Sequence, residues 1–101
     1  MKIPNKLKIG GFEWTIKENA EVAYEGNIYG TTHHTKQEIF LDPNMPQTKK
    51  EHTLLHEILH AIWWQAGLDK RYKDKPEIQE EIVSALSFGL HQVLKDNNLL
   101  K

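Results

Sequence analysis

The sequence contains no cysteine. This absence excludes a disulfide framework and any metal site built with thiolate ligands, so histidine and carboxylate side chains would have to hold a metal ion. It also fits a reducing compartment, where disulfides are rare. Any metal chemistry in this chain is therefore expected to use nitrogen and oxygen ligands.

The chain also has little excess charge and no long apolar run. Its formal net charge of -1 gives no electrostatic attraction to nucleic acid or to anionic lipid, so we expect neither nucleic acid nor membrane as a partner. No apolar run reaches membrane-span length, and residues 1–6 lack the apolar core of a signal peptide. We therefore expect a soluble protein in the cytoplasm. A length of 101 residues suits a single domain over residues 1–101, of unknown oligomeric state.

The N-terminal part of the chain predicts two β-hairpins. Residues 7–9 and 12–17 alternate apolar and polar side chains around Gly10-Gly11, a pair that suits a tight primed turn. The core face of this hairpin is expected to carry three residues: Phe12, Trp14 and Ile16. A polar stretch over residues 19–26 is expected to be a loop.

The second hairpin is predicted over residues 28–34 and 38–42, where threonine and tyrosine favour strands. Ile39 and Leu41 should face one side of the sheet, with Phe40 on the other. Four strands are therefore expected before the first helix.

A strongly helical run follows the strands. Thr48-Lys49-Lys50-Glu51 has the pattern of a capping box, which predicts a helix from there to about Ala66, where Gly67 would stop it. Apolar residues lie nearly all round this helix. Trp63 and Trp64 could line a substrate cleft, but we expect them to pack in the core. The helix should therefore lie between the sheet and another layer.

A charged connector over residues 68–75 separates this helix from a second one. Asp74 is expected to cap the second helix, with Pro76 in its first turn, and the helix should run to about Asp96. Its core stripe is expected to contain seven apolar residues: Ile78, Ile82, Val83, Leu86, Leu90, Val93 and Leu94.

The chemistry of the chain is indicated by His56-Glu57-Ile58-Leu59-His60, an H-E-x-x-H pattern inside the first helix. Residues four apart lie one above the other on an α-helix, so His56 and His60 present two imidazoles that can share one metal ion. Glu57 lies about 100° round the helix from His56 and can reach a water on that ion. Two neutral nitrogen ligands, an open position and a carboxylate base are the parts of a zinc hydrolase.

A catalytic zinc usually needs a third protein ligand. The metzincin pattern is excluded, because its glycine and third histidine would fall on Trp63 and Ala66. An antiparallel helical hairpin would return Glu80 to the imidazoles, and Glu81 is its close rival. Six residues downstream of the motif are candidates: Asp69, Asp74, Glu77, Glu80, Glu81 and His91.

Two adjacent histidines, His33 and His34, end the predicted third strand. Such a pair can bind metal or contact a substrate, although a solvated turn is its more common role. Neighbouring residues in a strand point to opposite faces, so at most one of the two is expected to reach a given site.

Four stretches of the chain carry a resemblance to a known family: residues 36–39 (KQEI), 50–61 (KEHTLLHEILHA), 80–86 (EEIVSAL) and 92–97 (QVLKDN). With them, residues 30–96 resemble the small phage- and prophage-associated metallopeptidases related to the ImmA/IrrE family, in the broader gluzincin group. The third stretch is similar to the E-x-x-V-x-x-L element of the family's ligand-bearing helix. Its glutamate falls on Glu80, so the resemblance favours Glu80 over Glu81 as the third ligand.

The resemblance implies an α+β, zincin-like fold. This fold has a small, mainly antiparallel sheet of about four strands, then an active-site helix and a second, ligand-bearing helix. A sheet edge lies beside the metal in such folds and takes a peptide substrate as an added strand. The strand over residues 38–41, or its partner over residues 28–32, would be that edge.

The resemblance also implies a zinc-dependent metallopeptidase that hydrolyses a peptide bond in a protein or peptide partner. One zinc ion per chain would be held by His56, His60 and Glu80, and Glu57 would accept the proton of the activated water. The same ligands can hold iron, manganese or nickel. A second electrophile is usual, and four residues stay open for that role: Tyr24, Tyr29, Tyr72 and His91.

The alternative function is a phage-encoded metal-binding interaction module. Such a module would keep the zincin scaffold and capture a protein partner without peptidase activity. The small size of the chain motivates this alternative, because it leaves little room for a deep specificity cleft.

Overall fold

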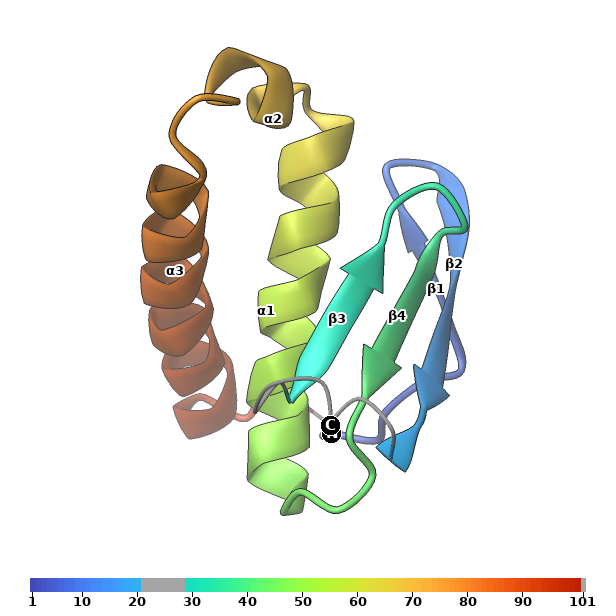
Figure 1. Cartoon of the computed structure of the whole chain (residues 1–101). Helices are drawn as coiled ribbons and strands as arrows, with labels where there is room; N and C mark the ends of the chain where they lie inside the picture. Colours follow the sequence, from blue (N-terminus) through green and yellow to red (C-terminus); the bar gives the residue numbers. More distant parts are fainter. Residues whose placement is uncertain (21–28, 101) are drawn as a thin grey trace.

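A computed structural model describes residues 1–20 and 29–100 of the chain. Within these residues, four strands come first and three helices follow, which confirms the predicted α+β fold. Figure 1 shows helix α1 (Gln47–Gln65) between the sheet on one side and helix α3 (Pro76–Asp96) on the other. The expected place of the H-E-x-x-H helix between two layers is confirmed.

The strands form one sheet in the order β1-β2-β4-β3. The β1/β2 and β3/β4 pairs are antiparallel and the β2/β4 pair is parallel, so the sheet is mainly antiparallel, as expected. Because β4 lies between β2 and β3, β3 is an edge strand of the sheet. The bounds of the strands are Lys6–Ile9 (β1), Phe12–Glu18 (β2), Gly30–His33 (β3) and Glu38–Leu41 (β4).

The first hairpin has the predicted turn. Gly10 and Gly11 have φ angles of 59° and 84°, the positive values that a primed turn requires and that glycine adopts without strain. Trp14 and Ile16 are buried, as expected. Phe12 is 54% exposed, so its predicted place in the core is wrong. It stands beside the turn, paired with Ile9, but it is not part of the core cluster to which Ile9 belongs.

The second hairpin has the predicted faces. Ile39 and Leu41 have no exposed surface, while Phe40 lies on the opposite face and packs edge-on against His33, with ring centroids 5.1 Å apart. The start of the predicted strand at residue 28 lies outside the described residues, as does most of the loop predicted over residues 19–26.

The predicted capping box at the start of α1 is wrong. The N-cap residue is Pro46, without a side-chain capping bond, so Thr48 already lies inside the helix. Glu51 is buried and directed into the protein, where its carboxylate contacts the amino group of Met1 and the side chains of His91 and Lys95. In a capping box, the side chain of Glu51 would bond back to the start of the helix. Here it makes contacts with distant parts of the fold instead.

The end of α1 is the one that the sequence predicts. Gly67 follows the helix with a φ angle of 80°, which confirms it as the stop. The connector contains a short helix, α2 (Leu68–Arg71). Helix α3 has Pro76 at its first position, but its N-cap is Lys75 and not the predicted Asp74. No helix among the described residues is long and apolar enough to cross a membrane.

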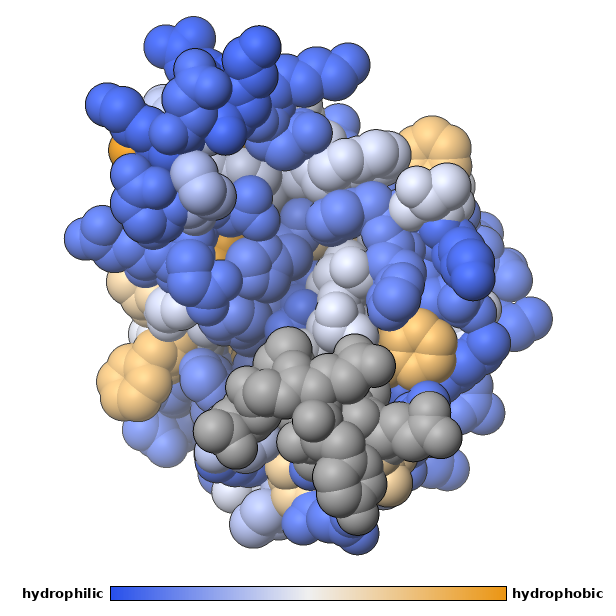
Figure 2. All heavy atoms as spheres, viewed as in Figure 1, coloured by the Kyte–Doolittle hydropathy of each residue, from blue (hydrophilic) through white to orange (hydrophobic). Residues whose placement is uncertain are grey.

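The core stripe predicted for α3 is largely wrong. Val83 is buried at 2%, and the other fully covered residue of the helix is Ser87, at 0%. The helix packs against α1 on one side alone, so its remaining apolar residues face outward, and Figure 2 shows apolar side chains at the surface on the α3 side. Four residues of the predicted stripe are 39–57% exposed: Ile82, Leu86, Leu90 and Val93.

The main core lies between the sheet and α1. Trp14 is fully buried, and its indole Nε1 donates to Oε1 of Gln65 at 2.9 Å. Gln65 Nε2 in turn donates to the carbonyl oxygen of Ile9 at 2.9 Å, so the last turn of α1 is bridged to the first hairpin. Trp63 is buried, as predicted, but Trp64 is 41% exposed and stacks on His34, so its predicted core position is wrong.

Replacing Gln65 by leucine is expected to reduce the free energy of unfolding by about 1–3 kcal/mol, because the buried indole N–H of Trp14 loses its acceptor. Urea denaturation followed by tryptophan fluorescence measures this change. Gln92→Leu, on the exposed side of α3, is the control and should change stability by no more than about 0.5 kcal/mol. Equal stability of Gln65→Leu and the parent would show that the bridge contributes nothing.

Candidate metal centre

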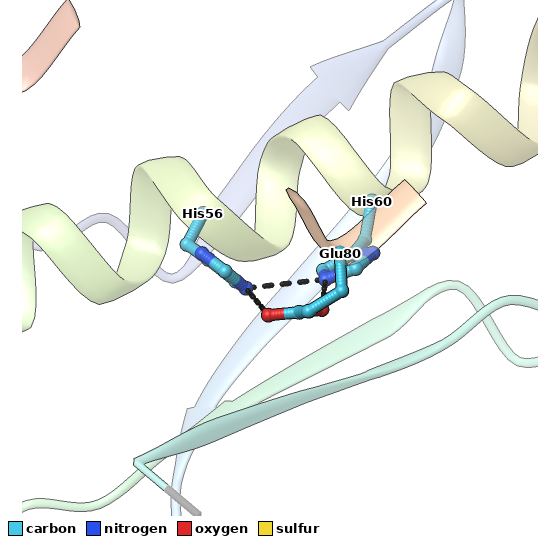
Figure 3. Close-up of side chains that lie close together, drawn as sticks. All are labelled: His56, His60 and Glu80. Atoms are coloured by element: carbon cyan, nitrogen blue, oxygen red, sulfur yellow. Dashed lines mark hydrogen bonds and ion pairs between the residues drawn. The ribbon is translucent and has the colours of Figure 1, made fainter. Parts of the chain in front are cut away.

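Three side chains from two helices meet at one point. His56 and His60 project from successive turns of α1, and their Nε2 atoms lie 3.1 Å apart. Glu80 reaches across from α3, with Oε1 3.2 Å from His56 Nε2 and Oε2 3.1 Å from His60 Nε2 (Figure 3). All three residues offer donor atoms that lie within 4.8 Å of one another.

These donors fit a divalent metal ion. Around a tetrahedral ion with ligands at about 2.0–2.2 Å, neighbouring donor atoms are about 3.3 Å apart. The observed separations of 3.1–3.2 Å between the two Nε2 atoms and the Glu80 oxygens are close to that value. With three protein donors, a fourth position would stay open for water. The group can therefore hold a metal ion in the way a catalytic site requires.

The structure brings Glu80, and not Glu81, to the two histidines. Glu81 is exposed on the neighbouring position of α3 and belongs to no donor group among the described residues. The antiparallel arrangement of α1 and α3 places Glu80 beside His56 and His60, as expected for an antiparallel helical hairpin. The other downstream candidates, Asp69, Asp74, Glu77 and His91, are not part of the group.

Burial affects the charge of the first histidine. His56 is 19% exposed, and its burial lowers its pKa, while the nearby carboxylate of Glu80 acts in the opposite direction. A lowered pKa favours the neutral imidazole at neutral pH, and the neutral form is the one that binds a metal. Glu80 is 60% exposed, so the group opens to solvent on its carboxylate side.

Glu57 occupies the sheet side of the same helix. It is buried at 7% exposure, and the hydroxyl of Thr32, on the edge strand β3, donates to its Oε1 at 2.7 Å. Burial raises the pKa of Glu57, and the bond from Thr32 partly opposes this shift. The carboxylate is therefore fixed in orientation and is more basic than an exposed glutamate.

A glycine allows this approach of β3 to α1. A Cβ added at Gly30 would stand 2.8 Å from a methyl carbon of Thr53 and 3.2 Å from Cγ of Glu57. The first distance is shorter than real Cβ contacts, and the second would require Glu57 to shift by a few tenths of an ångström, so the absence of a side chain at residue 30 favours this close approach of β3 to α1. Sequence reasoning did not find Thr32, because its contact with Glu57 depends on the packing of two distant segments.

The donor group formed by His56, His60 and Glu80 lies in a cleft of about 720 Å³ lined by β3, α1 and α3. His34 lines this cleft, where its ring stacks on Trp64, while His33 packs on Phe40 at the other face of the strand. The prediction that at most one of the two histidines reaches the site is confirmed. The one that does is His34, and burial lowers its pKa.

Among the four residues considered as a second electrophile, Tyr29 is the one that lines the cleft. Its ring lies under Nζ of Lys49, 3.6 Å from the centroid. Tyr72, in the connector, packs against Trp63 of α1, and His91 contacts Glu51. Neither Tyr72 nor His91 is among the residues that line the cleft. The fourth, Tyr24, lies outside the described residues.

Two further contacts involve the Nδ1 atoms of His56 and His60, the outer ring nitrogens of the pair. Gln79 Oε1 lies 2.6 Å from His60 Nδ1, and Ser87 Oγ lies 3.3 Å from His56 Nδ1. Sequence reasoning missed both residues. A signal was present for Ser87, because it follows Glu80 by seven residues and so lies two turns along the same helix face.

Adding zinc to metal-free protein is expected to raise its melting temperature, because the donor group exists only while α3 is docked on α1. At a zinc concentration about 100 times the Kd, the stabilisation should be about 2.7 kcal/mol. Glu80→Ala should lose most of this shift and Glu81→Ala should keep it, as measured by differential scanning calorimetry. A full shift in Glu80→Ala, or equal losses in the two variants, would contradict the arrangement of the site.

The chain also matches a known protein family. A family model, peptidase M78, described as the IrrE N-terminal-like domain, matches residues 14–94. Comparisons with curated proteins and with solved structures give no significant match. The matched region contains β3, β4, α1 and α2 and most of β2 and α3, and with them the whole donor group. The match supports a function of the metallopeptidase type. The chain belongs to the peptidase M78 family, through its IrrE N-terminal-like domain.

Proposed function

We propose that this protein is a zinc-dependent metallopeptidase of the gluzincin type, which hydrolyses a peptide bond in a protein partner. The observation that carries the proposal is the combination of two features in one cleft. His56, His60 and Glu80 form a three-donor group, and Glu57 is held beside it as a buried carboxylate. Membership of the M78 family supports the same reaction class.

Zinc is the preferred ion because two imidazoles, one carboxylate and an open position suit it, although iron, manganese and nickel accept the same ligands. When bound, one zinc ion per chain would supply Lewis-acid activation of a water molecule. His56 and His60 would hold it through Nε2, and Glu80 through its carboxylate.

Glu57 would act as the general base that takes the proton of the attacking water. Its burial and raised pKa bring its basicity closer to neutral pH, where a general base works best. The hydroxyl of Thr32 keeps the carboxylate in one orientation, which fixes the place from which it can take a proton. Thr32 belongs to the edge strand, so the base is positioned by the same element that would meet the substrate.

The edge strand β3 supports a peptide as substrate. Because β3 ends the sheet, one side of its backbone has no neighbouring strand among the described residues. Unpaired N–H and C=O groups on such an edge can bind an extended peptide as an added strand. Residues 29–32 of this segment line the cleft, so a peptide bound there would pass the metal-binding group.

Glu57→Gln is expected to bind zinc with parent affinity and to lose peptide hydrolysis, because glutamine keeps the shape of the side chain but cannot accept the proton. Removal of a general base typically reduces the rate by about 10²–10⁴-fold. Cleavage is measured on a proteome-derived peptide library by mass spectrometry, and zinc content by elemental analysis.

Glu81→Gln is the matched control, since Glu81 is exposed and lies outside the donor group, and it should cleave like the parent. This comparison also separates the interaction module from the enzyme. If Glu57→Gln retains zinc and shows the full effect of the parent in cells, peptide hydrolysis is not the function.

A further inference from the structure

Helix α3 places an oxygen atom beside the outer nitrogen of each histidine of the pair. We propose that Ser87 and Gln79 are positioning residues, whose oxygens accept hydrogen bonds from Nδ1–H of His56 and His60 and so keep Nε2 of each ring free as a metal donor. This proposal rests on the metal site of the proposed function, and it concerns how the apoprotein prepares that site.

The hydrogen-bond inventory of Ser87 determines the direction of its contacts. Ser87 has no exposed surface, so its hydroxyl group must find its partners inside the protein. It donates its one hydrogen to the carbonyl oxygen of Ser84 at 3.2 Å. Its two lone pairs then face His56 Nδ1 at 3.3 Å and His52 Nε2 at 3.5 Å. While this hydrogen is donated to Ser84, each imidazole can form a hydrogen bond with Ser87 only as a donor.

The consequence for His56 is a fixed tautomer. A neutral imidazole that carries its proton on Nδ1 has its lone pair on Nε2. In His56 this Nε2 atom is the one that faces His60 and Glu80. In the metal-free protein the carboxylate of Glu80, 3.2 Å from Nε2, competes for this proton, and without an acceptor at Nδ1 the proton would move to Nε2 and block the donor atom. Ser87 thus selects the form of His56 that can bind the metal.

Gln79 has the same relation to His60. With its amide oxygen 2.6 Å from His60 Nδ1, Gln79 can accept a hydrogen bond there, which favours the tautomer that carries the proton on Nδ1. Gln79 precedes Glu80 directly, and Ser87 lies two turns further along α3. One helix therefore contributes the third donor and both outer hydrogen-bond acceptors, so its docking on α1 sets the ligand atoms and their protonation together.

Ser87→Ala tests the proposal with zinc alone and needs no substrate. We expect the zinc Kd of the metal-free protein, measured by competition with a chromophoric chelator, to rise by about 10–100-fold. In ¹⁵N NMR spectra of the metal-free protein, His56 should show the Nδ1–H tautomer in the parent and a mixture in the variant. Gln79→Ala, at a partly exposed position, should have the same two effects centred on His60.

Val83→Ala is the matched control for packing. Val83 is buried at 2% on the same face of α3, one turn before Ser87, and its side chain has no polar group to offer the histidines. It should lower the melting temperature while leaving the zinc Kd and the tautomers as in the parent.

Parent affinity and parent tautomers in both Ser87→Ala and Gln79→Ala would overturn the proposal. An equal loss of affinity in Val83→Ala would overturn it too, because packing would then explain the effect. A parent protein that binds no zinc would refute the proposed function, and the tautomers of the metal-free protein would still decide the role of Ser87.

Discussion

The packing of α3 against α1 is the contact on which the site depends. Helix α1 alone supplies two imidazoles one turn apart, which are two of the three donors of the group. The antiparallel return of α3 adds the carboxylate of Glu80, and it adds oxygens beside the outer nitrogens of both rings. Any change that separates the two helices therefore removes ligands and hydrogen-bond partners in one step.

Helix α1 also joins the two halves of the proposed chemistry. Its α3 side carries the histidine pair, and its sheet side carries Glu57, which Thr32 holds from the edge strand. This helix is apolar nearly all round because its residues contact both the sheet and α3. The close approach of β3 at Gly30 places this strand, which has β4 as its one neighbouring strand among the described residues, beside the cleft. Glu57, the donor group and β3 therefore all border one cavity.

Features set by local spacing could be predicted from the sequence. The Gly10-Gly11 turn, the stop at Gly67 and the facing of His56 and His60 follow from backbone geometry within a few residues. Features set by packing could not. Glu51 fits the sequence pattern of a capping box, but its side chain lies in a buried cluster. Leu86 fits the pattern of a core stripe, but it lies on the side of α3 that no described element covers. Thr32 and Ser87 gain their roles only from segments that are distant in the chain.

We propose that His56, His60 and Glu80 together hold one zinc ion. Crystals of the zinc-loaded protein, with diffraction data collected on both sides of the zinc absorption edge, test it most directly. One anomalous peak per chain is expected, at about 2.0–2.2 Å from Nε2 of each histidine and from a carboxylate oxygen of Glu80. A peak bound by Glu81 in place of Glu80, or no peak at the histidine pair, would contradict it.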